Sequence, residues 1–324
     1  MNAAVAVSIV SYNGRALLDQ CLSCVTSQVY RPLEIFLLDN GSTDGTVEFV
    51  RSRYPAVNVF SSAQNLGFAA AHNRIIRLTE SPFVLVLNQD AFLSETFLKE
   101  LMAAMTEHPE VGIAGGKLYS ARNQQFGNGR PVIDMTWLDI EKKRRQVCYA
   151  QGELDVGQAD VPRFAFALDG AAMLLRRSML KDIQVDSEVF DEDFFAGKED
   201  LDLSWRAQLT GWRCLYVPSA TGYHLRTFSP SDKRRNISPH LRTASIRNRY
   251  LLIFKNDLPA YFARHLPEIL FYELQILIYV LLHERSSLRG YAQAICLLPR
   301  ALKKRSVIMS RKKTTGTYIY EWFK

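Results

Sequence analysis

The stretch FVLVLNQD, residues 83–90, is an apolar run that ends in three polar residues. Residues 83–87 are typical of a strand buried on both faces, and Asn88, Gln89 and Asp90 follow where that strand would end. Ligands of open α/β sheets bind at the carboxyl ends of strands, so a rigidly held Asp90 is well placed to bind a divalent cation or a ribose. Asn and Asp are also common in turns, so this stretch alone leaves both interpretations open.

The segments around this stretch alternate between strand and helix patterns. The predicted strands are residues 4–11, 33–38, 57–61, 83–87, 111–115 and 213–217, and the predicted helices are 15–28, 46–54, 69–78 and 96–108. Such alternation predicts an α/β fold with a mostly parallel sheet flanked by helices. The polar stretch 119–163 has no pattern that orders it.

Composition narrows the class of protein. The chain has 324 residues, a hydrophobic fraction of 48% and a net charge of +7, as in a globular protein with an ample core. Basic residues are concentrated in 285–313, which indicates an anionic partner, although we expect no nucleic acid. Five scattered cysteines and an N-terminus without the pattern of a signal peptide indicate a reducing, cytoplasmic compartment. The turn after the first strand has one glycine, Gly14, which disfavours a dehydrogenase-type dinucleotide fold.

Four side chains stand where strands end or helices begin: Asp39, Asp90, Asp200 and His224. Asp90 and His224 together offer oxygen and nitrogen ligands for Mg²⁺ or Mn²⁺, with ligand phosphates completing the shell. A hydrogen-bonded core histidine is the alternative for His224. The acidic group Glu199, Asp200 and Asp202 opens a predicted helix, so it is either a cap favoured by the helix dipole or a general base near a cation.

In combination, the motifs of residues 4–224 resemble inverting glycosyltransferases of family 2, which have the GT-A fold. These motifs are VSIVSYNG (7–14), LLDNGSTDGT (37–46), NLGFAAAHN (65–73), LVLNQD (85–90), DGAAMLLRR (169–177), FDEDFFAGKEDLDLSWRAQLTGW (190–212) and VPSATGYH (217–224). Within the family, the chain is most similar to rhamnosyltransferase-like members that build bacterial surface polysaccharides.

The resemblance implies a role for each matching residue. Asp200 matches the catalytic base, Asp90 the last aspartate of the metal-binding DxD signature, and His224 a second metal ligand. The signature here reads Asn-Gln-Asp, so its first acid is missing. The donor site would consist of Tyr12, Asp39, Ser42, Asn65, Phe68, Asn73, Asn88 and Asp90, with Asp39 bonding the pyrimidine base. Asp169, Gly170 and Glu199 would lie on the acceptor side.

The resemblance also implies an activity. The enzyme would move a sugar, plausibly L-rhamnose from dTDP-L-rhamnose, to a lipid-linked saccharide, with inversion in a single displacement. UDP-galactose, UDP-GlcNAc and UDP-galactofuranose are alternative donors.

A nucleotidyltransferase usually needs a Gly-rich basic loop after the first strand, which Ser11–Gly14 does not supply. An inactive, membrane-bound scaffold remains the non-enzymatic alternative, favoured by the missing acid. No Q-x-x-R-W motif follows His224, which argues against a processive synthase.

The C-terminal third is expected to hold a basic acceptor loop and helix (227–257) and an amphipathic, basic helical region (258–324), after a catalytic domain of 1–226. Apolar stretches 266–282 and 289–302 lie close to Lys and Arg clusters, including Lys303, Lys304 and Arg305. This pattern predicts a helix pair on the anionic cytoplasmic face of the membrane, from which removal of 288–324 would release the protein. A hairpin packed on the catalytic domain or across a homodimer is the alternative.

Overall fold

Strand β4 (Phe83–Asn88) lies inside the large sheet of the computed structural model, which describes residues 2–122, 130–226 and 237–324. It pairs in parallel with β1 (Val5–Ser11) on one side and antiparallel with β12 (Ala172–Arg176) on the other. Every residue from 83 to 87 is buried, as expected for a strand covered on both faces. The fold class predicted from the sequence is therefore confirmed.

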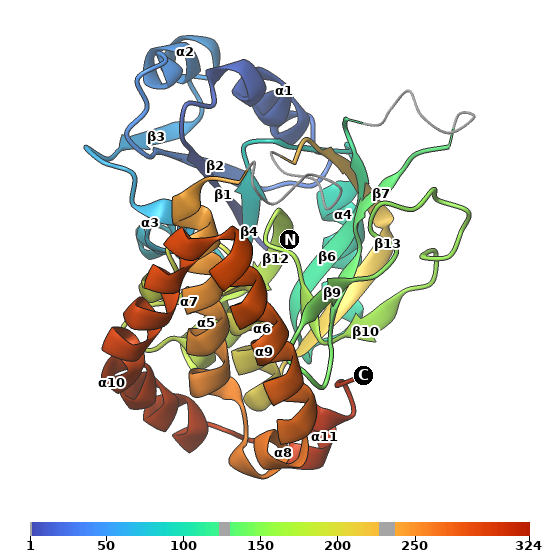
Figure 1. Ribbon diagram of the computed structural model, residues 1–324. Helices are drawn as coiled ribbons and strands as arrows, with labels where there is room; N and C mark the ends of the chain where they lie inside the picture. Colours follow the sequence, from blue (N-terminus) through green and yellow to red (C-terminus); the bar gives the residue numbers. More distant parts are fainter. Residues whose placement is uncertain (1, 123–129, 227–236) are drawn as a thin grey trace.

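The sheet has the order β10-β13-β6-β12-β4-β1-β2-β3, with β5 and β7 attached at β13 and β6 (Figure 1). Strands β3, β2, β1 and β4 run in parallel, and β10 and β12 are antiparallel to their neighbours. The remaining strands of both sheets are β2 (Leu33–Asp39), β3 (Asn58–Ser61), β5 (Ala91–Leu93), β6 (Val111–Ser120), β7 (Ile133–Met135), β8 (Trp137–Ile140), β9 (Gln146–Cys148), β10 (Arg163–Ala165), β11 (Ala167–Leu168) and β13 (Arg213–His224). The stretch 119–163, which had no clear pattern, contributes β7, β8 and β9.

Helices cover both faces of the sheet (Figure 1). They are α1 (Arg15–Thr26), α2 (Thr46–Arg53), α3 (Gly67–Leu78), α4 (Phe97–Glu107), α5 (Arg177–Ile183), α6 (Glu199–Leu209), α7 (Pro239–Asn256), α8 (Pro259–Arg264), α9 (Leu266–His283), α10 (Leu288–Ser310) and α11 (Gly316–Tyr320). Alternation along β4 explains the layers, because successive side chains of a strand point to opposite faces. Leu85 and Leu87 share a core with α1 and α4, whereas Val84 and Val86 pack with α3 and α5.

The strand register brings the predicted site residues to one edge of the sheet. Ser11 at the end of β1 is level with Asp39 at the end of β2, and Val10 is level with Asn88 at the end of β4. β5 turns back from Asp90 and pairs with the end of β13, where His224 lies opposite Ala91. The parallel strands thus bring the predicted site residues to their carboxyl ends, where ligands of this fold class bind.

The C-terminal residues pack on the catalytic region through α10 and α11. Side chains of α10, α11 and the last turn, such as Ile308 and Phe323, belong to the same hydrophobic cluster as Val5 and Leu85. Lys304, expected at a membrane surface, is 2% exposed and paired with carboxylates, and Arg305 donates to backbone carbonyls near the end of α7. The membrane-surface prediction is wrong for these two residues. One side of α10 packs on the sheet domain, whereas Leu288, Ile295 and Leu302 of the same helix are exposed. Residues 227–236 of the predicted acceptor loop lie outside the described residues.

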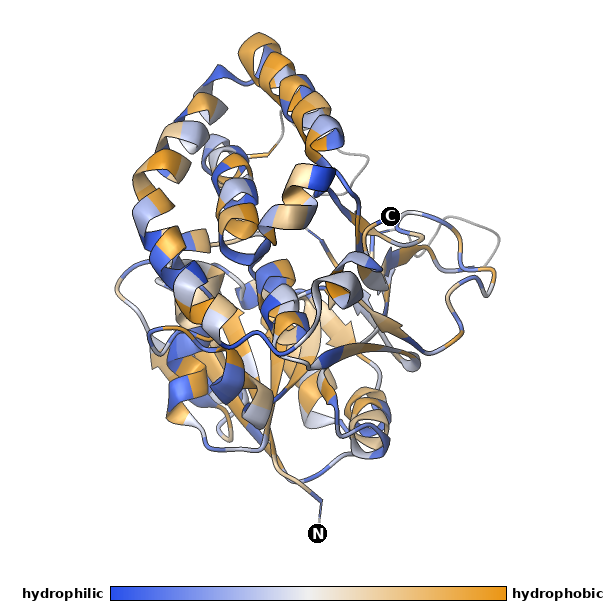
Figure 2. Cartoon of the chain, turned by 90° about the horizontal axis from the view of Figure 1, so that it is seen from below, coloured by the Kyte–Doolittle hydropathy of each residue, from blue (hydrophilic) through white to orange (hydrophobic). Residues whose placement is uncertain are grey.

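Helix α9 differs from α10. By length and composition, α9 is the one helix within the described ranges that could cross a bilayer. Only 11% of its residues are buried. Its exposed apolar side chains include Phe271, Leu274 and Ile278. Glu273 anchors the helix to α7 through Arg249 and Tyr250. Figure 2 shows hydrophobic residues on the helices as well as along the central strands. A large apolar face of this kind marks an interaction surface.

Candidate active site

A cavity of about 490 Å³ opens at the carboxyl ends of the strands. It gathers residues from seven separate parts of the chain, which are the start of α3, the end of β4, the start of β9, the turn before β12, the loop and first turn of α6, the end of β13 and α7. Eight residues that the sequence singled out line it: Phe68, Asn88, Asp90, Asp169, Gly170, Glu199, Asp200 and His224. Motifs up to 156 residues apart in sequence order, as from Phe68 to His224, therefore meet around one space.

Asp200 lies in the first turn of α6 and is 8% exposed. Its carboxylate accepts hydrogen bonds from the backbone N–H of Leu201 at 2.7 Å and of Gly170 at 3.2 Å. Burial, followed by the negative charge of Asp169, raises the pKa of Asp200 to about 6. A carboxylate with this pKa is ionised at neutral pH and can still accept a proton efficiently, which suits a general base.

Glu199 adjoins Asp200 but has a different environment. Its Oε2 atom is buried without a hydrogen-bond partner among the described residues. Burial and the charge of Asp200 raise the pKa of Glu199 to about 8, so this side chain is mostly protonated at neutral pH. The two adjacent carboxyl groups are thus separated into an ionised and a neutral one, the arrangement typical of acid–base sites. The third acid of the motif, Asp202, points away from the cavity and bonds Arg206 and Lys255.

His224 lies between two aspartates. Its Nε2 atom is 3.3 Å from Asp90 Oδ1, and its Nδ1 atom is 2.7 Å from Asp134 Oδ2. Burial alone would lower the pKa of His224, but the hydrogen bonds to Asp134 and Asp90 outweigh it and raise the pKa to about 9. Asp134 comes from β7, in the region that the sequence pattern left unordered, and it was not predicted as a site residue.

The Asp90–His224 pair fits a divalent cation that has few protein ligands and that displaces the Nε2 proton of the charged His224. Its adjacent atoms are a carboxylate oxygen and an imidazole nitrogen, both ligand types of Mn²⁺. The Nδ1 bond to Asp134 leaves Nε2 as the nitrogen that faces Asp90, as in the carboxylate-oriented histidines of metal sites. Among residues 2–122, 130–226 and 237–324 no group of three or more His, Cys, Asp and Glu gathers with metal-binding geometry. Further ligands would therefore have to come from a bound diphosphate and water.

Two cations line the same cavity and were not predicted as site residues. Arg226 follows β13 and contacts Asp134 at 3.2 Å and Asp169 at 3.8 Å. Lys198 precedes α6 in the left-handed backbone region, with φ of 72°. The positive charge of Lys198 partly offsets the raised pKa of Asp200. In the sequence, the only signals were that Lys198 directly precedes Glu199 and Asp200 and that Arg226 follows shortly after VPSATGYH (217–224).

The predicted base-binding residues lie beside the cavity, at the ends of β1 and β2. Asp39 is 3% exposed, and its Oδ2 accepts a hydrogen bond from the N–H of Ser42 at 3.1 Å. Its Oδ1 is buried without a partner among the described residues. Ser42 in turn accepts the N–H of Asn13 at 2.8 Å, and the side chain of Tyr12 is 49% exposed. Leaving a buried carboxylate oxygen without a hydrogen bond is costly, so we expect Asp39 Oδ1 to accept a hydrogen bond from a bound ligand.

The predicted donor loop is held by its own hydrogen bonds. Asn65 Oδ1 accepts from Asn40 Nδ2 at 3.0 Å and from the N–H of Gly67 at 2.8 Å. Gly67 has φ of +79°, and a Cβ there would lie 2.5 Å from Phe195 O, so only glycine fits. Asn73 does not line the cavity. It is 1% exposed, and its amide bonds the backbone of Val189 and Phe190.

Comparison with known proteins gives a family match. The model of the family described as "Glycosyltransferase like family 2" matches residues 3–245. The region matched contains every residue that lines the cavity.

The chain is also similar to individual proteins. It is 28% identical over 263 residues, 74% of this chain and 82% of the relative, to the N-acetylglucosaminyl-diphospho-decaprenol L-rhamnosyltransferase of Mycobacterium tuberculosis. TarS 1-349 of S. aureus, solved with UDP-GlcNAc, is 18% identical with a TM-score of 0.56 over 96% of this chain and 89% of that one. The mannosyltransferase PcManGT of Pyrobaculum calidifontis, solved with GDP-Man and Mn2+, is 17% identical with a TM-score of 0.54 over 96% and 86%. These two structures share the fold.

Proposed function

The chain belongs to the family 2 glycosyltransferases, and from this we propose that it is an inverting, non-processive enzyme that transfers a sugar from a nucleoside diphosphate to a lipid-linked saccharide. The observation that supports it most is the position of Asp200, which faces the same cavity as Asp90 and His224. A base and a diphosphate-binding pair on one cavity are what a single displacement requires. Glycoside hydrolases differ, because they use two flanking carboxylates.

We assign the base to Asp200. Its carboxylate would take the proton from an acceptor hydroxyl as that oxygen forms a bond to the anomeric carbon. The bond from the anomeric carbon to the diphosphate oxygen breaks on the opposite face, and its electron pair leaves with the nucleoside diphosphate. The N–H groups of Gly170 and Leu201 hold the carboxylate in place. Neutral Glu199 beside it adds no second negative charge near the entering hydroxyl.

The diphosphate end of the site is assigned to Asp90 and His224. Mg²⁺ or Mn²⁺ bound there would neutralise the charge that develops on the leaving diphosphate. Asp134 orients His224, and Arg226 supplies a permanent cation close by. The missing first acid of the DxD signature, where Asn88 stands, leaves a smaller negative charge to attract the cation, so the donor diphosphate is expected to contribute to its binding.

The donor is proposed to be dTDP-L-rhamnose, and UDP-galactose, UDP-GlcNAc or UDP-galactofuranose is the alternative. The free Oδ1 of Asp39 suits the N3–H of thymine or uracil, whereas cytosine carries no hydrogen at N3. The name of the mycobacterial relative specifies an L-rhamnosyl group and a lipid-diphosphate acceptor. Both features agree with the proposal for this chain, together with a place in cell-surface polysaccharide synthesis.

The site of action is proposed to be the cytoplasmic face of the cell membrane. The exposed apolar face of α9 would lie on the bilayer, where a lipid-linked acceptor is found. The basic hairpin tip between β8 and β9 is next to this helix, since Lys143 lies over the ring of Tyr272 at 5.4 Å. Apolar and basic groups side by side suit an anionic membrane surface.

Thermal stabilisation by nucleotides tests the proposal. We expect dTDP or UDP to raise the melting temperature of the protein with Mn²⁺ or Mg²⁺ present, and CDP to have little effect. A metal-dependent shift identifies the base of the donor, and radiolabelled transfer from the matching nucleotide sugar to a lipid-linked GlcNAc acceptor then tests the reaction. Absence of any shift with all nucleotides would contradict the donor site and favour the scaffold.

The Asp200→Asn variant tests the base. The change keeps the shape of the side chain and removes its ability to take a proton, so transfer should fall about 10²- to 10⁴-fold. The nucleotide-dependent shift in melting temperature should persist. Turnover equal to that of the wild type would exclude Asp200 as the base.

A further inference from the structure

A second cavity adjoins the catalytic one. Its volume is about 480 Å³, and Gln146, Lys198 and Ser245 line both spaces, so the two share these residues as a common wall. The outer cavity lies between the hairpin of β8 and β9, helix α7 and helix α9. None of the predicted site residues lines it, and no step of the proposed reaction uses it.

The two cavities differ in charge. Asp90, Asp169, Glu199 and Asp200 line the catalytic one, together with Lys198, His224 and Arg226. The lining of the outer cavity, within the described part of the chain, has three basic side chains and no acid. The basic residues are Arg145, Lys198 and Arg249. Arg249 is bonded to Glu273, whereas Arg145 is exposed at the hairpin tip. An anionic group in the outer cavity would therefore face cations and no lining carboxylate, whereas in the catalytic cavity it would also face Asp90, Asp169 and Asp200.

The α9 wall gives the outer cavity an amphipathic character. Tyr272, Gln275 and Tyr279 recur at helical spacing and line it. The adjacent side of the same helix exposes Phe271, at 64%, and other apolar residues to the exterior. A molecule in this cavity thus meets cations at its inner end and leaves along an apolar helix face. These are the two requirements of a phosphorylated lipid.

We propose that the outer cavity binds the diphosphate and the first isoprenoid units of a polyprenyl-diphosphate-linked acceptor, an inference that rests on the proposed function. The acceptor sugar would reach through the shared residues Gln146 and Ser245 to Asp200. Its diphosphate would lie near Arg145 and Lys198, and its chain would run along α9 into the bilayer. The size of the cavity suits part of such a ligand, and the remainder of the chain stays in the membrane.

Binding of farnesyl diphosphate to the full-length protein tests the inference. Calorimetric titrations are made with and without a saturating nucleotide that gave a thermal shift, at one fixed metal concentration. Inorganic pyrophosphate serves as the probe for the diphosphate half of the ligand, and farnesol as the probe for its isoprenoid half. We expect farnesyl diphosphate to bind with the nucleotide present, and each half alone to bind at least 10-fold more weakly.

Two exposed positions test the location. Arg145→Gln removes a cation from the hairpin side, and Gln275→Glu adds an anion on the α9 side with almost no change in shape. Each is expected to weaken farnesyl diphosphate binding at least 5-fold and to leave nucleotide binding unchanged. Arg51→Gln, an exposed position on α2, is the control for net charge and should have no effect.

The outcomes separate this inference from the proposed function. Unchanged affinity in both variants, or displacement of farnesyl diphosphate by the nucleotide, would overturn the outer site. Pyrophosphate binding as tight as that of farnesyl diphosphate would also overturn it, since the site would then be one for free phosphates. Nucleotide binding without farnesyl diphosphate binding removes this inference alone. Farnesyl diphosphate binding that depends on Arg145, without any nucleotide binding, would keep the site and contradict the transferase.

Discussion

The side-chain amide of Asn248 donates a hydrogen bond to the carbonyl oxygen of Gly197 at 2.7 Å. The same nitrogen lies 2.9 Å from Phe194 O and 3.0 Å from Ala196 O. This one buried side chain of α7 therefore holds the loop that leads into Glu199 and Asp200. The loop contains two non-glycine residues with positive φ, Phe195 at 61° and Lys198 at 72°, a conformation that persists only where surrounding contacts enforce it.

The Asn248→Ala variant is expected to lose activity because the loop before α6 would lose its anchor. Phe194 O keeps its bond from Arg247, but Ala196 O and Gly197 O lose the bonds from Asn248, which should lower the free energy of unfolding by about 0.5–1.5 kcal/mol each. Displacement of the base should reduce the turnover number roughly 10- to 100-fold. Steady-state kinetics and thermal unfolding measure the two effects.

A second variant separates loss of position from loss of stability. Val25→Ala removes apolar contacts from the core side of α1, which lies away from the loop. Compared at a temperature where both variants are fully folded, only Asn248→Ala should have a reduced turnover number. Equal activity of the two variants would show that Asn248 serves stability alone.

The pH dependence of transfer should have an acidic limb near the pKa of Asp200, about 6. Asp200 must be ionised to accept a proton, so activity rises with pH through this value. The charge of Asp169 contributes to the raised pKa. Asp169→Asn should therefore move the limb to lower pH, while burial keeps it above the ordinary aspartate value of about 3.9.

The Asp169→Asn substitution is nearly isosteric. The asparagine Oδ1 can still accept the hydrogen bond that the N–H of Ala171 donates to Asp169. Asp186→Asn is the matched control, since Asp186 is exposed and its left-handed backbone suits asparagine. Initial rates between pH 4.5 and 8 in both variants measure the shift. A limb that stays in place in Asp169→Asn would assign it to a group other than Asp200.

The sequence predicted the residues at the carboxyl edge of the sheet well, because a single strand pattern and the polar residues that follow it are enough to place each of them. The apolar run 83–87 and its polar end place Asp90, and the same reasoning places Asp39. Asp134 and Arg145 were missed, because they come from the polar stretch 119–163, where short strands carry no clear period. Their positions depend on pairing with β6 and on packing against α7 and α9, which no window of sequence contains.

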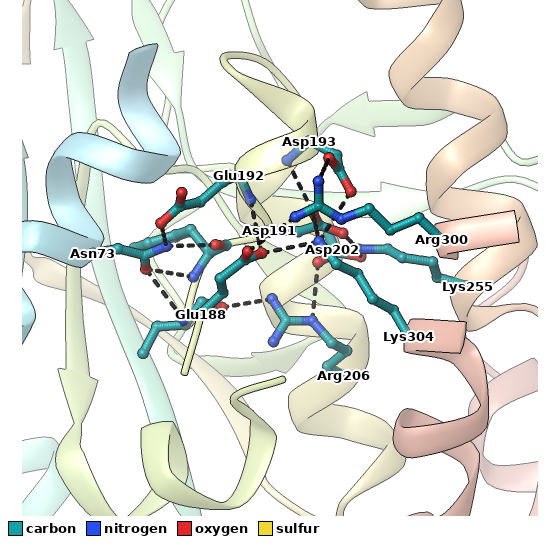
Figure 3. A network of polar contacts seen from close by, with 12 residues as sticks. Asn73, Glu188, Asp191, Glu192, Asp193, Asp202, Arg206, Lys255, Arg300 and Lys304 are labelled. Carbon is teal, nitrogen blue, oxygen red and sulfur yellow. Dashed lines mark hydrogen bonds and ion pairs between the residues drawn. The ribbon is translucent and has the colours of Figure 1, made fainter. Parts of the chain in front are cut away.

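Lys304 was misplaced for a related reason. A basic run in an amphipathic helix is typical of a membrane surface, but partners more than 110 residues away determine its environment. Lys304 Nζ lies 2.9 Å from Glu188 and 3.0 Å from Asp193, and it also bonds Asp191 (Figure 3). Asp191 is shared with Lys255 of α7. The network joins α10 to the segment before the catalytic helix.

The Lys304→Met variant is expected to be strongly destabilised. Without Lys304 the three carboxylates keep only Lys255 and Arg300, so their buried negative charge is compensated only in part, and loss of a buried partner costs about 3–5 kcal/mol. Chemical unfolding at pH 7 measures this difference. Arg300→Met is the control, because Arg300 also contacts Glu188 and Asp193 but its side chain is 53% exposed. Equal losses in the two variants would contradict the importance of burial.

The effect of Lys304 should also depend on pH. Burial opposes ionisation of Asp191, but the charges of Lys255 and Lys304 outweigh it and hold the pKa of Asp191 below its ordinary value. A lowered folded-state pKa stabilises the protein above the unfolded value of about 3.9, and this contribution is lost as pH falls further. The difference between the wild type and Lys304→Met should thus shrink below about pH 4. A difference that is constant from pH 7 to pH 3 would exclude this electrostatic origin.

Membrane binding should depend on α9 more than on the segment 288–324, since Ile308 and Phe323 of that segment are core residues and its exposed large apolar side chains are fewer than those of α9. Leu274 and Ile278 are 54% and 48% exposed on α9, so replacing both by Glu should leave the fold intact. Each such side chain contributes about 1.5–3 kcal/mol when buried in an apolar phase, and the double variant should lose well over 10-fold in affinity for anionic vesicles. Leu78→Glu, at a position 48% exposed on α3, is the control and should float with the vesicles as the wild type does.

If the α9 double variant floats equally well, the helix face does not bind membrane. A concurrent change in sedimentation from dimer to monomer would then assign that face to a second copy of the chain.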